Sequence, residues 1–279
     1  MPSTLDPESS KGIFGLFKGE SGTGKSVGAL SFPNPYVFDF DKKMPTISKK
    51  HFPGKSVTYD HFEDIFEVAS KMEELNQYCP YETLIFDSVT SLCNMVINTT
   101  AKIRGEETMK MFNNIKNAPK GKQVEMITID YYNNEVRFIQ NFWVDALKQL
   151  WSKRGNPRHV IVIAHVLVVE SSPDLKTKVR TTTRSIVTSG KKVAAYIPTQ
   201  FDEMYNFTVL DSQLGSSNLR HVCSTEARGD DNAKTAYHLP GTIDFTNGSL
   251  YKEITKYVSL EEHTNSETTE GQVDSNPFA

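Results

Sequence analysis

No stretch of this 279-residue sequence approaches the roughly 18 consecutive apolar residues that a membrane-spanning helix requires. The first residues, MPSTLDPESSK, also lack a basic region followed by an apolar one, so no signal peptide is predicted. We therefore expect a protein of the cytoplasm that has no membrane partner.

Cysteine is scarce as well. Cys79, Cys93 and Cys223 are odd in number and lack the spacing of metal ligands, which argues against a disulfide framework and against a zinc site. We expect these three residues to be buried small apolar side chains in a reducing compartment.

A surplus of positive charge is absent too, because 31 Lys and Arg residues stand against 34 Asp and Glu residues. The net charge of −3 excludes a protein that is basic over its whole surface, so any contact with nucleic acid needs a local basic patch. With 38% hydrophobic residues, the chain can bury the core of one domain.

The most informative stretch that is present is GLFKGESGTGKSVGAL, residues 15–30, which contains the Walker A pattern G-x-x-x-x-G-K-[ST]. An apolar run before it reads as a strand, and a helix can begin after it. Glycines let the backbone N–H groups curl around phosphates. We expect Lys25, as an exposed loop side chain, to reach the β- and γ-phosphates, and the Ser26 hydroxyl to ligate Mg²⁺. The expected nucleotide-binding residues are Gly19, Glu20, Ser21, Gly22, Thr23, Gly24, Lys25 and Ser26. The alternative is a glycine turn before an ordinary helix.

Two apolar segments further along, 35–41 and 83–88, read as strands that end in acidic residues. Between them, Asp60 and Glu63 predict a capping box at the start of a helix that runs to about residue 78. The alternation of strand, helix and strand predicts a mostly parallel sheet with helices on both faces.

Asp87 closes the second of these strands and matches the Walker B position. The carboxyl ends of parallel strands are where α/β proteins bind ligands, so we expect Asp87 to hold Mg²⁺ beside Ser26. The alternative is an aspartate that only caps the next helix.

His165 interrupts the apolar run HVIVIAHVLVV, residues 159–169, which predicts another strand. A lone histidine in such a run is usually a satisfied core residue. At this position it could also sense the γ-phosphate of a bound nucleotide, and both interpretations stay open.

Two later segments are locally basic. Residues 94–135 carry six basic side chains among Asn, Gly and Pro, and we expect part of this segment to be a mobile loop. The segment 170–192 follows the strand of His165, and a DNA contact there would respond to the γ-phosphate. The expected DNA-binding residues are Lys176, Lys178, Arg180, Arg184, Lys191 and Lys192. The alternative is a solvated loop.

The order of these motifs resembles the RecA-like ATPases, and more narrowly their small phage-type single-domain members, which include the Sak-type single-strand annealing ATPases. The matching phrases are GESGTGKS, YVFDFD, TLIFDS, HVIVIAH, KKVAAYIPTQFDEMYNF and AKTAYHLP. The resemblance implies an α/β fold with a RecA-like P-loop NTPase core, a mostly parallel sheet with helices on both faces, and antiparallel C-terminal strands. We expect a flexible N-terminus at 1–10, an ATPase domain at 11–258 and a disordered acidic tail at 259–279.

The resemblance also implies roles for individual residues. The water-activating carboxylate falls on Asp41, where the family more often has Glu, so the expected catalytic residues are Lys25, Asp41 and His165. In relatives that form rings or filaments, a Lys-x-Arg pair enters the neighbouring active site; here Lys234 matches the lysine and Ala236 replaces the arginine. The implied cofactors are ATP and Mg²⁺. The implied partners are single-stranded DNA, a single-strand-binding protein and further copies of the chain.

Two functions follow from these features. The first is a Mg²⁺-dependent ATPase that acts on single-stranded DNA in recombination or annealing, in the host cytoplasm if a phage encodes it. The second is a nucleotide-gated interaction module with slow or no turnover that recruits a DNA-replication or phage partner, which Asp41 and Ala236 favour. A small-molecule kinase fits less well because no arginine-rich lid is evident, and a G protein because N-K-x-D and D-x-x-G are absent.

The last residues, 261–279, carry five acidic side chains and no Lys or Arg. Such a segment has too little apolar surface to offset the entropy of ordering, so we expect it to be disordered. Its final residues, DSNPFA, weakly resemble the acidic Pro-Phe tips of single-strand-binding proteins. The alternative is a tail that only adds solubility.

Overall fold

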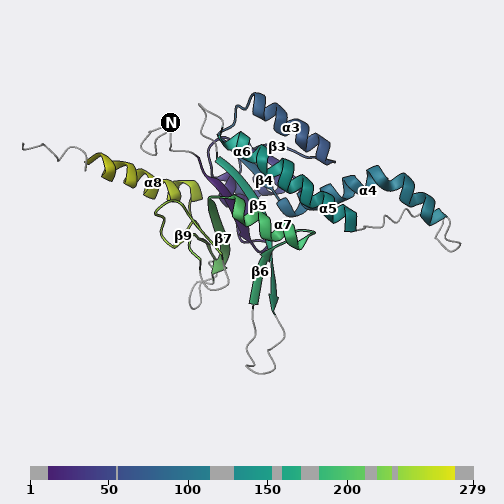
Figure 1. Ribbon diagram of the computed structural model, residues 1–279. Helices are drawn as coiled ribbons and strands as arrows, with labels where there is room; N and C mark the ends of the chain where they lie inside the picture. Colours follow the sequence, from purple (N-terminus) through teal and green to yellow (C-terminus); the bar gives the residue numbers. More distant parts are fainter. Residues whose placement is uncertain are drawn as a thin grey trace, which may run out of the picture.

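A computed structural model describes residues 12–54, 56–113, 129–152, 159–170, 182–210, 219–227 and 232–267. Within these residues, nine strands form one sheet with the order β3-β2-β4-β5-β1-β7-β8-β9, and β6 pairs with β5 (Figure 1). The strands are β1 (Phe14–Gly19), β2 (Pro35–Asp39), β3 (Thr58–Asp60), β4 (Thr83–Asp87), β5 (His159–Glu170), β6 (Thr182–Ile186), β7 (Glu203–Leu210), β8 (Arg220–Ser224) and β9 (Thr242–Asp244).

The strands from β3 to β7 run parallel in this order, whereas β8, β9 and β6 are antiparallel to their neighbours. Every residue of β1, β2 and β4 is buried, as expected for parallel strands that are covered on both faces. The predicted α/β fold class is therefore confirmed in its architecture: the core is a mostly parallel sheet with antiparallel C-terminal strands.

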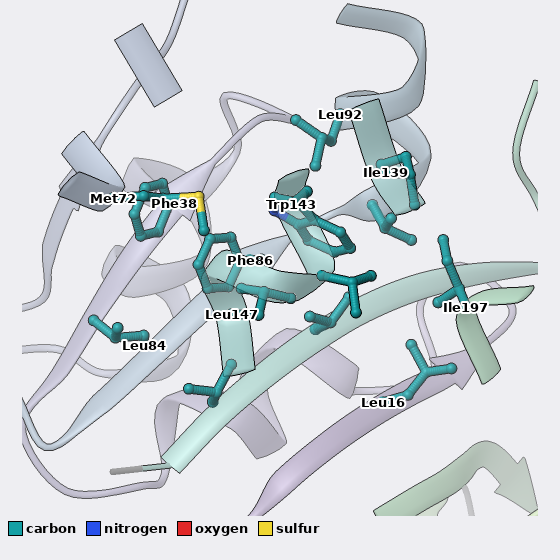
Figure 2. Packing of buried hydrophobic residues seen from close by; sticks show 14 of the residues in the cluster. Leu16, Phe38, Met72, Leu84, Phe86, Leu92, Ile139, Trp143, Leu147 and Ile197 are labelled. Atoms are coloured by element: carbon teal, nitrogen blue, oxygen red, sulfur yellow. The ribbon is translucent and has the colours of Figure 1, made fainter. Parts of the chain in front are cut away.

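Alternate side chains of the strands point into two separate apolar cores. On one face, Leu16 of β1 and Phe86 of β4 pack with Trp143 and other residues of the covering helices (Figure 2). On the other face, Phe17 and Ile85 pack against a second set of helices. Because successive side chains of a strand point to opposite faces of the sheet, each strand contributes residues to both cores.

The helices divide between these two faces. The first face is covered by α3 (Ile65–Gln77), α4 (Val89–Asn113), the π-helical turn η2 (Ile139–Trp143), α6 (Val144–Ser152), α7 (Lys191–Tyr196) and the 3₁₀ turn η3 (Ile197–Gln200), with α5 (Ile129–Phe138) leading into η2. The second face is covered by α1 (Lys25–Leu30), α2 (Met44–His51) and α8 (Leu250–Glu267).

Two local predictions differ from the structure, and a third is described only in part. The capping box at Asp60 is wrong: Asp60 ends β3 and accepts a hydrogen bond from Tyr36, while Asp64 caps α3 by accepting from the N–H groups of Phe66 and Glu67. The segment 94–135, part of which was expected to be a mobile loop, is helical up to the end of α4 at Asn113 and again from the start of α5 at Ile129. Residues 114–128 lie outside the described residues, so the loop stays a prediction. The expected disordered tail is also helical at its start, since α8 continues to Glu267, anchored at its beginning by buried Leu250 and Ile254. Residues 268–279 lie outside the described residues, as does the predicted N-terminus at 1–10.

The three cysteines are free and buried, as expected. None of the helices in the described part of the chain combines the length and the apolarity needed to cross a membrane.

Candidate nucleotide site

The loop between β1 and α1 has a backbone that requires glycine. A Cβ atom at Gly19 would lie 2.4 Å from the carbonyl oxygen of Phe207 on the neighbouring strand β7. Gly22 and Gly24 have φ angles of 81° and 92°, in the left-handed region that favours glycine. The glycines of the Walker A pattern therefore have a steric reason in this structure.

Lys25 is the first residue of α1, directly after this loop. Its side chain is buried, which contradicts the expectation of an exposed lysine, and Nζ donates hydrogen bonds to the carbonyl oxygens of Gly19 (2.9 Å) and Glu20 (2.6 Å). Burial lowers the pKa of Lys25 to about 8, although the carboxylates of Asp87 and Asp41 oppose this shift. A bound anion would favour the charged ammonium further.

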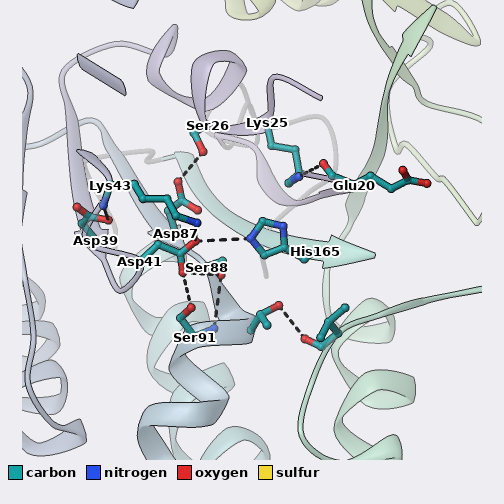
Figure 3. A network of polar contacts seen from close by, with 12 residues as sticks. Glu20, Lys25, Ser26, Asp39, Asp41, Lys43, Asp87, Ser88, Ser91 and His165 are labelled. Carbon is teal, nitrogen blue, oxygen red and sulfur yellow. Dashed lines mark hydrogen bonds and ion pairs between the residues drawn. The ribbon is translucent and has the colours of Figure 1, made fainter. Parts of the chain in front are cut away.

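Ser26 and Asp87 meet where α1 begins and β4 ends. The Ser26 hydroxyl donates a hydrogen bond of 2.6 Å to Oδ2 of Asp87 (Figure 3). Burial raises the pKa of Asp87 to about 6, and the nearby Asp41 and Asp39 add to the shift while the Ser26 hydrogen bond opposes it. A divalent cation beside Oδ2 would stabilise the ionised form.

These two oxygens fit Mg²⁺, which usually takes one or two protein ligands and completes its shell with phosphate oxygens and waters. Among the described residues, no group of three or more His, Cys, Asp or Glu side chains could hold a metal ion.

Asp39 is the last residue of β2 and Asp41 follows the strand, but the two carboxylates have different surroundings. Asp39 is fully buried, and its carboxylate accepts hydrogen bonds from the N–H groups of Lys43 and Met44 at the start of α2. The Asp41 carboxylate lies 3.5 Å from Nε2 of His165 and 3.2 Å from Nζ of Lys43. Burial favours the neutral form of Asp41, but hydrogen bonds to His165 and Ser91 outweigh it and hold the pKa below its usual range.

His165 lies on the central strand β5, in register with Gly19 at the end of β1. Its side chain is 27% exposed and faces Asp41, so His165 is not part of either apolar core. The structure therefore places the histidine between the P-loop and the carboxylate that was predicted to activate water.

Most of these side chains, although not Asp39 or Ser91, line one cavity of about 470 Å³. Its lining includes Gly22 and Gly24 of the loop and six further predicted positions, which are Ser21, Lys25, Ser26, Asp41, Asp87 and His165. The predicted residues Gly19, Glu20 and Thr23 lie outside the lining. Sequence reasoning missed a second set of lining residues, Lys43, Ile47, Lys50, His51, His221, Phe245 and Thr246.

The missed residues come from two distant parts of the chain. Lys43 directly precedes α2 and His51 ends it, whereas His221 lies on β8 and Phe245 directly follows β9. The His221 and Phe245 rings have centroids 6.2 Å apart, and Nδ1 of His221 lies 3.4 Å from the Thr23 carbonyl oxygen. No local motif marks them, because only the sheet brings β8 and β9 beside the loop.

The six residues predicted to bind DNA are only partly described. Lys176, Lys178 and Arg180 lie outside the described residues. Arg184 lies on β6 and lines a separate cavity of about 120 Å³ together with Gly19 and Glu20. Lys191 and Lys192 are exposed at the start of α7.

Lys234, the predicted contributor to a neighbouring active site, does not line the cavity of its own chain. Its backbone pairs with Met204 of β7 in both directions, at 2.8 and 2.9 Å, and its side chain is exposed. The neighbouring Ala236 N–H donates to the buried carboxylate of Glu203 at 2.6 Å. This segment is thus held firmly at the edge of β7.

Comparison with known proteins adds one family and two distant structural likenesses. The sequence profile described as an AAA domain matches residues 11–237. No curated protein matches the chain. Among solved structures, the chain is similar to flagellar accessory protein FlaH from Methanocaldococcus jannaschii, with 12% sequence identity and a TM-score of 0.36; the match covers 84% of this chain and 85% of that chain. It is also similar to the KaiC-like protein PH0186 from Pyrococcus horikoshii OT3, with 10% identity, a TM-score of 0.40, and 84% and 90% covered.

Proposed function

The chain belongs to the AAA domain family, and from this premise and the cavity at its P-loop we propose that it binds ATP with Mg²⁺ and hydrolyses the γ-phosphate. The observation that carries the proposal is the meeting of Lys25, Ser26 and Asp87 with Asp41 in one cavity. These groups are the ones that phosphate binding, cation binding and water activation need.

Each side chain would do one task. Lys25 would donate to the β- and γ-phosphate oxygens, and Ser26 with Asp87 would hold the cation. Mg²⁺, when bound, offsets the charge that develops on the phosphates. Asp41 would orient the attacking water and accept its proton, with His165 beside it to contact the γ-phosphate.

The low pKa of Asp41 bears on the expected rate. A general base works best when its pKa lies near the working pH, and the pKa of Asp41 lies far below neutral pH. Asp41 therefore suits the orientation of water better than strong proton abstraction, which predicts slow turnover.

We propose single-stranded DNA as the partner that stimulates this turnover, in recombination or annealing. Support comes from the connection between the site and the basic segment: the N–H of Val187 donates to the carbonyl oxygen of His165 at 2.7 Å, and Arg184 and Lys191 flank Val187 in sequence. A single-strand-binding protein and further copies of the chain, in a ring or filament in which Lys234 reaches a neighbour, complete this proposal.

The alternative function is a nucleotide-gated interaction module that recruits a replication partner. The short, strongly acidic Asp41 and the alanine at position 236 favour it. In this case the bound nucleotide, rather than its hydrolysis, would control the partner.

One experiment separates these functions. ATP turnover is measured with Mg²⁺ in the presence and absence of single-stranded DNA, and Lys25→Ala serves as the inactive control. Stimulation by DNA supports the first function, whereas tight ATP binding with slow turnover that DNA does not change supports the second. Turnover and binding that are the same in wild type and Lys25→Ala would overturn both.

A further inference from the structure

Ser91 in the first turn of α4 and Ser88 just before this helix hold the Asp41 carboxylate from outside the nucleotide cavity. The Ser91 hydroxyl donates a hydrogen bond to Oδ1 of Asp41, and the Ser88 hydroxyl donates to the same oxygen at 3.2 Å (Figure 3). Neither serine lines the cavity. Two hydroxyl groups thus occupy one carboxylate oxygen from the helix side.

The second oxygen of Asp41 is directed the other way. Oδ2 lies 3.2 Å from Lys43 Nζ and 3.5 Å from His165 Nε2, and both of these residues line the cavity. An aspartate side chain has only two rotatable bonds, so a hold on Oδ1 also sets the direction of Oδ2. The carboxylate is only 8% exposed, which leaves it little other space.

The backbone on both sides of this contact is fixed too. The N–H groups of Phe40 and Asp41 donate to the carbonyl oxygen of Asp87 at 2.8 and 3.3 Å. On α4, the Thr90 hydroxyl donates to the Val187 carbonyl oxygen at 2.8 Å. The Ser91 hydroxyl is therefore presented from a turn that is itself anchored next to the strand of His165.

From this geometry we infer that Ser91 is a positioning residue for Asp41: it holds Oδ1 so that Oδ2 points at the water that attacks the γ-phosphate. The inference rests on the proposed function, because it gives Ser91 a part in ATP hydrolysis. Ser91 acts only through Asp41. A displacement of a reacting group by about 1 Å can cost a hundredfold in rate, so the hold matters even though Ser91 touches no substrate.

The test compares Ser91→Ala with Ser91→Thr, which keeps a hydroxyl, and with Thr100→Ala, which removes a hydroxyl from the same helix far from Asp41. We expect Ser91→Ala to lower kcat about tenfold while KM for ATP and ATP binding stay unchanged. Ser91→Thr should restore much of the rate, and Thr100→Ala should behave as wild type. Thermal melting checks that each variant folds, and Ser91→Cys, a weaker donor of similar size, repeats the test if Ser91→Ala does not fold.

A double variant tests whether Ser91 acts through Asp41. In an Asp41→Asn background, Ser91→Ala should cause no further loss of kcat, because residues that act as a unit are not additive. An unchanged kcat in Ser91→Ala, a raised KM alone, or additive losses in the double variant would overturn the inference. Failure of the proposed function is seen separately, as wild-type turnover no higher than that of Lys25→Ala.

Discussion

The Ser26 hydroxyl and the Asp87 carboxylate form a hydrogen bond of 2.6 Å although they belong to α1 and β4. Strand β4 is separated from β1 by β5 in the sheet, so the contact is made by the helix that follows the P-loop. Because the Ser26 and Asp87 oxygens are close enough to share a hydrogen bond, both can coordinate the same small cation.

Asp87→Asn should therefore weaken the Mg²⁺ dependence of the protein. The amide keeps the size of the side chain but loses the charge, so we expect the Mg²⁺ concentration for half-maximal turnover to rise about tenfold. A titration of turnover against Mg²⁺ at saturating ATP measures it. A titration curve identical to that of wild type would remove Asp87 from the cation site.

Asp41→Asn should separate binding from hydrolysis. ATP affinity should stay close to wild type, while kcat falls about a hundredfold, the usual contribution of a general base. Equilibrium binding of a fluorescent ATP analogue and steady-state turnover give the two values. Normal hydrolysis in this variant would show that another group activates water.

Joint replacement of Lys176, Lys178, Arg180 and Arg184 by alanine should weaken binding to single-stranded DNA. Each lost phosphate contact lowers the slope of log affinity against log salt by about 0.7. The matched control replaces four lysines from other surfaces, Lys102, Lys148, Lys252 and Lys256, which changes the net charge equally. If both variants show the same slope as wild type, the segment 170–192 is not the DNA site.

We expect the buried His159 to make the folded protein less stable in mild acid. Its Nδ1 accepts a hydrogen bond from the N–H of Ile13, and the rings of Phe32 and Tyr251 lie within 5.4 Å. Burial lowers its pKa from 6.5 to about 4. Between these two values the unfolded chain binds a proton that the folded chain does not, so the free energy of unfolding falls as the pH drops from 6.5 towards 4.

The measurement is the urea midpoint at pH 7 and at pH 5. A pKa difference of one unit corresponds to about 1.4 kcal/mol, so the fall is measurable. His159→Asn, which keeps an acceptor near Nδ1 but cannot titrate, should show a smaller fall. An equal fall in the two proteins would assign the acid sensitivity to other groups.

The phosphate side of the site could be predicted from the sequence, but the opposite side could not. The phosphate side depends on short patterns, since Gly19 to Ser26 are contiguous and Asp87 ends an apolar strand. The other side is formed by His51, His221 and Phe245, which no spacing connects. Helix starts were also hard to predict: Asp60 and Asp64 both precede helix-forming residues, and the pairing of β3 with β2 places Asp60 in a strand.

The sequence by itself determined the strand and helix alternation, the P-loop and the acidic ends of the strands, because these follow from periodicity and from the backbone freedom of glycine over a few adjacent residues. Only the tertiary structure decided which groups meet. The insertion of β5 between β1 and β4 places His165 beside Gly19, and the packing of α4 on the sheet brings Ser91 to Asp41. Contacts between residues far apart in the chain depend on the strand order and on helix packing, which local sequence does not encode.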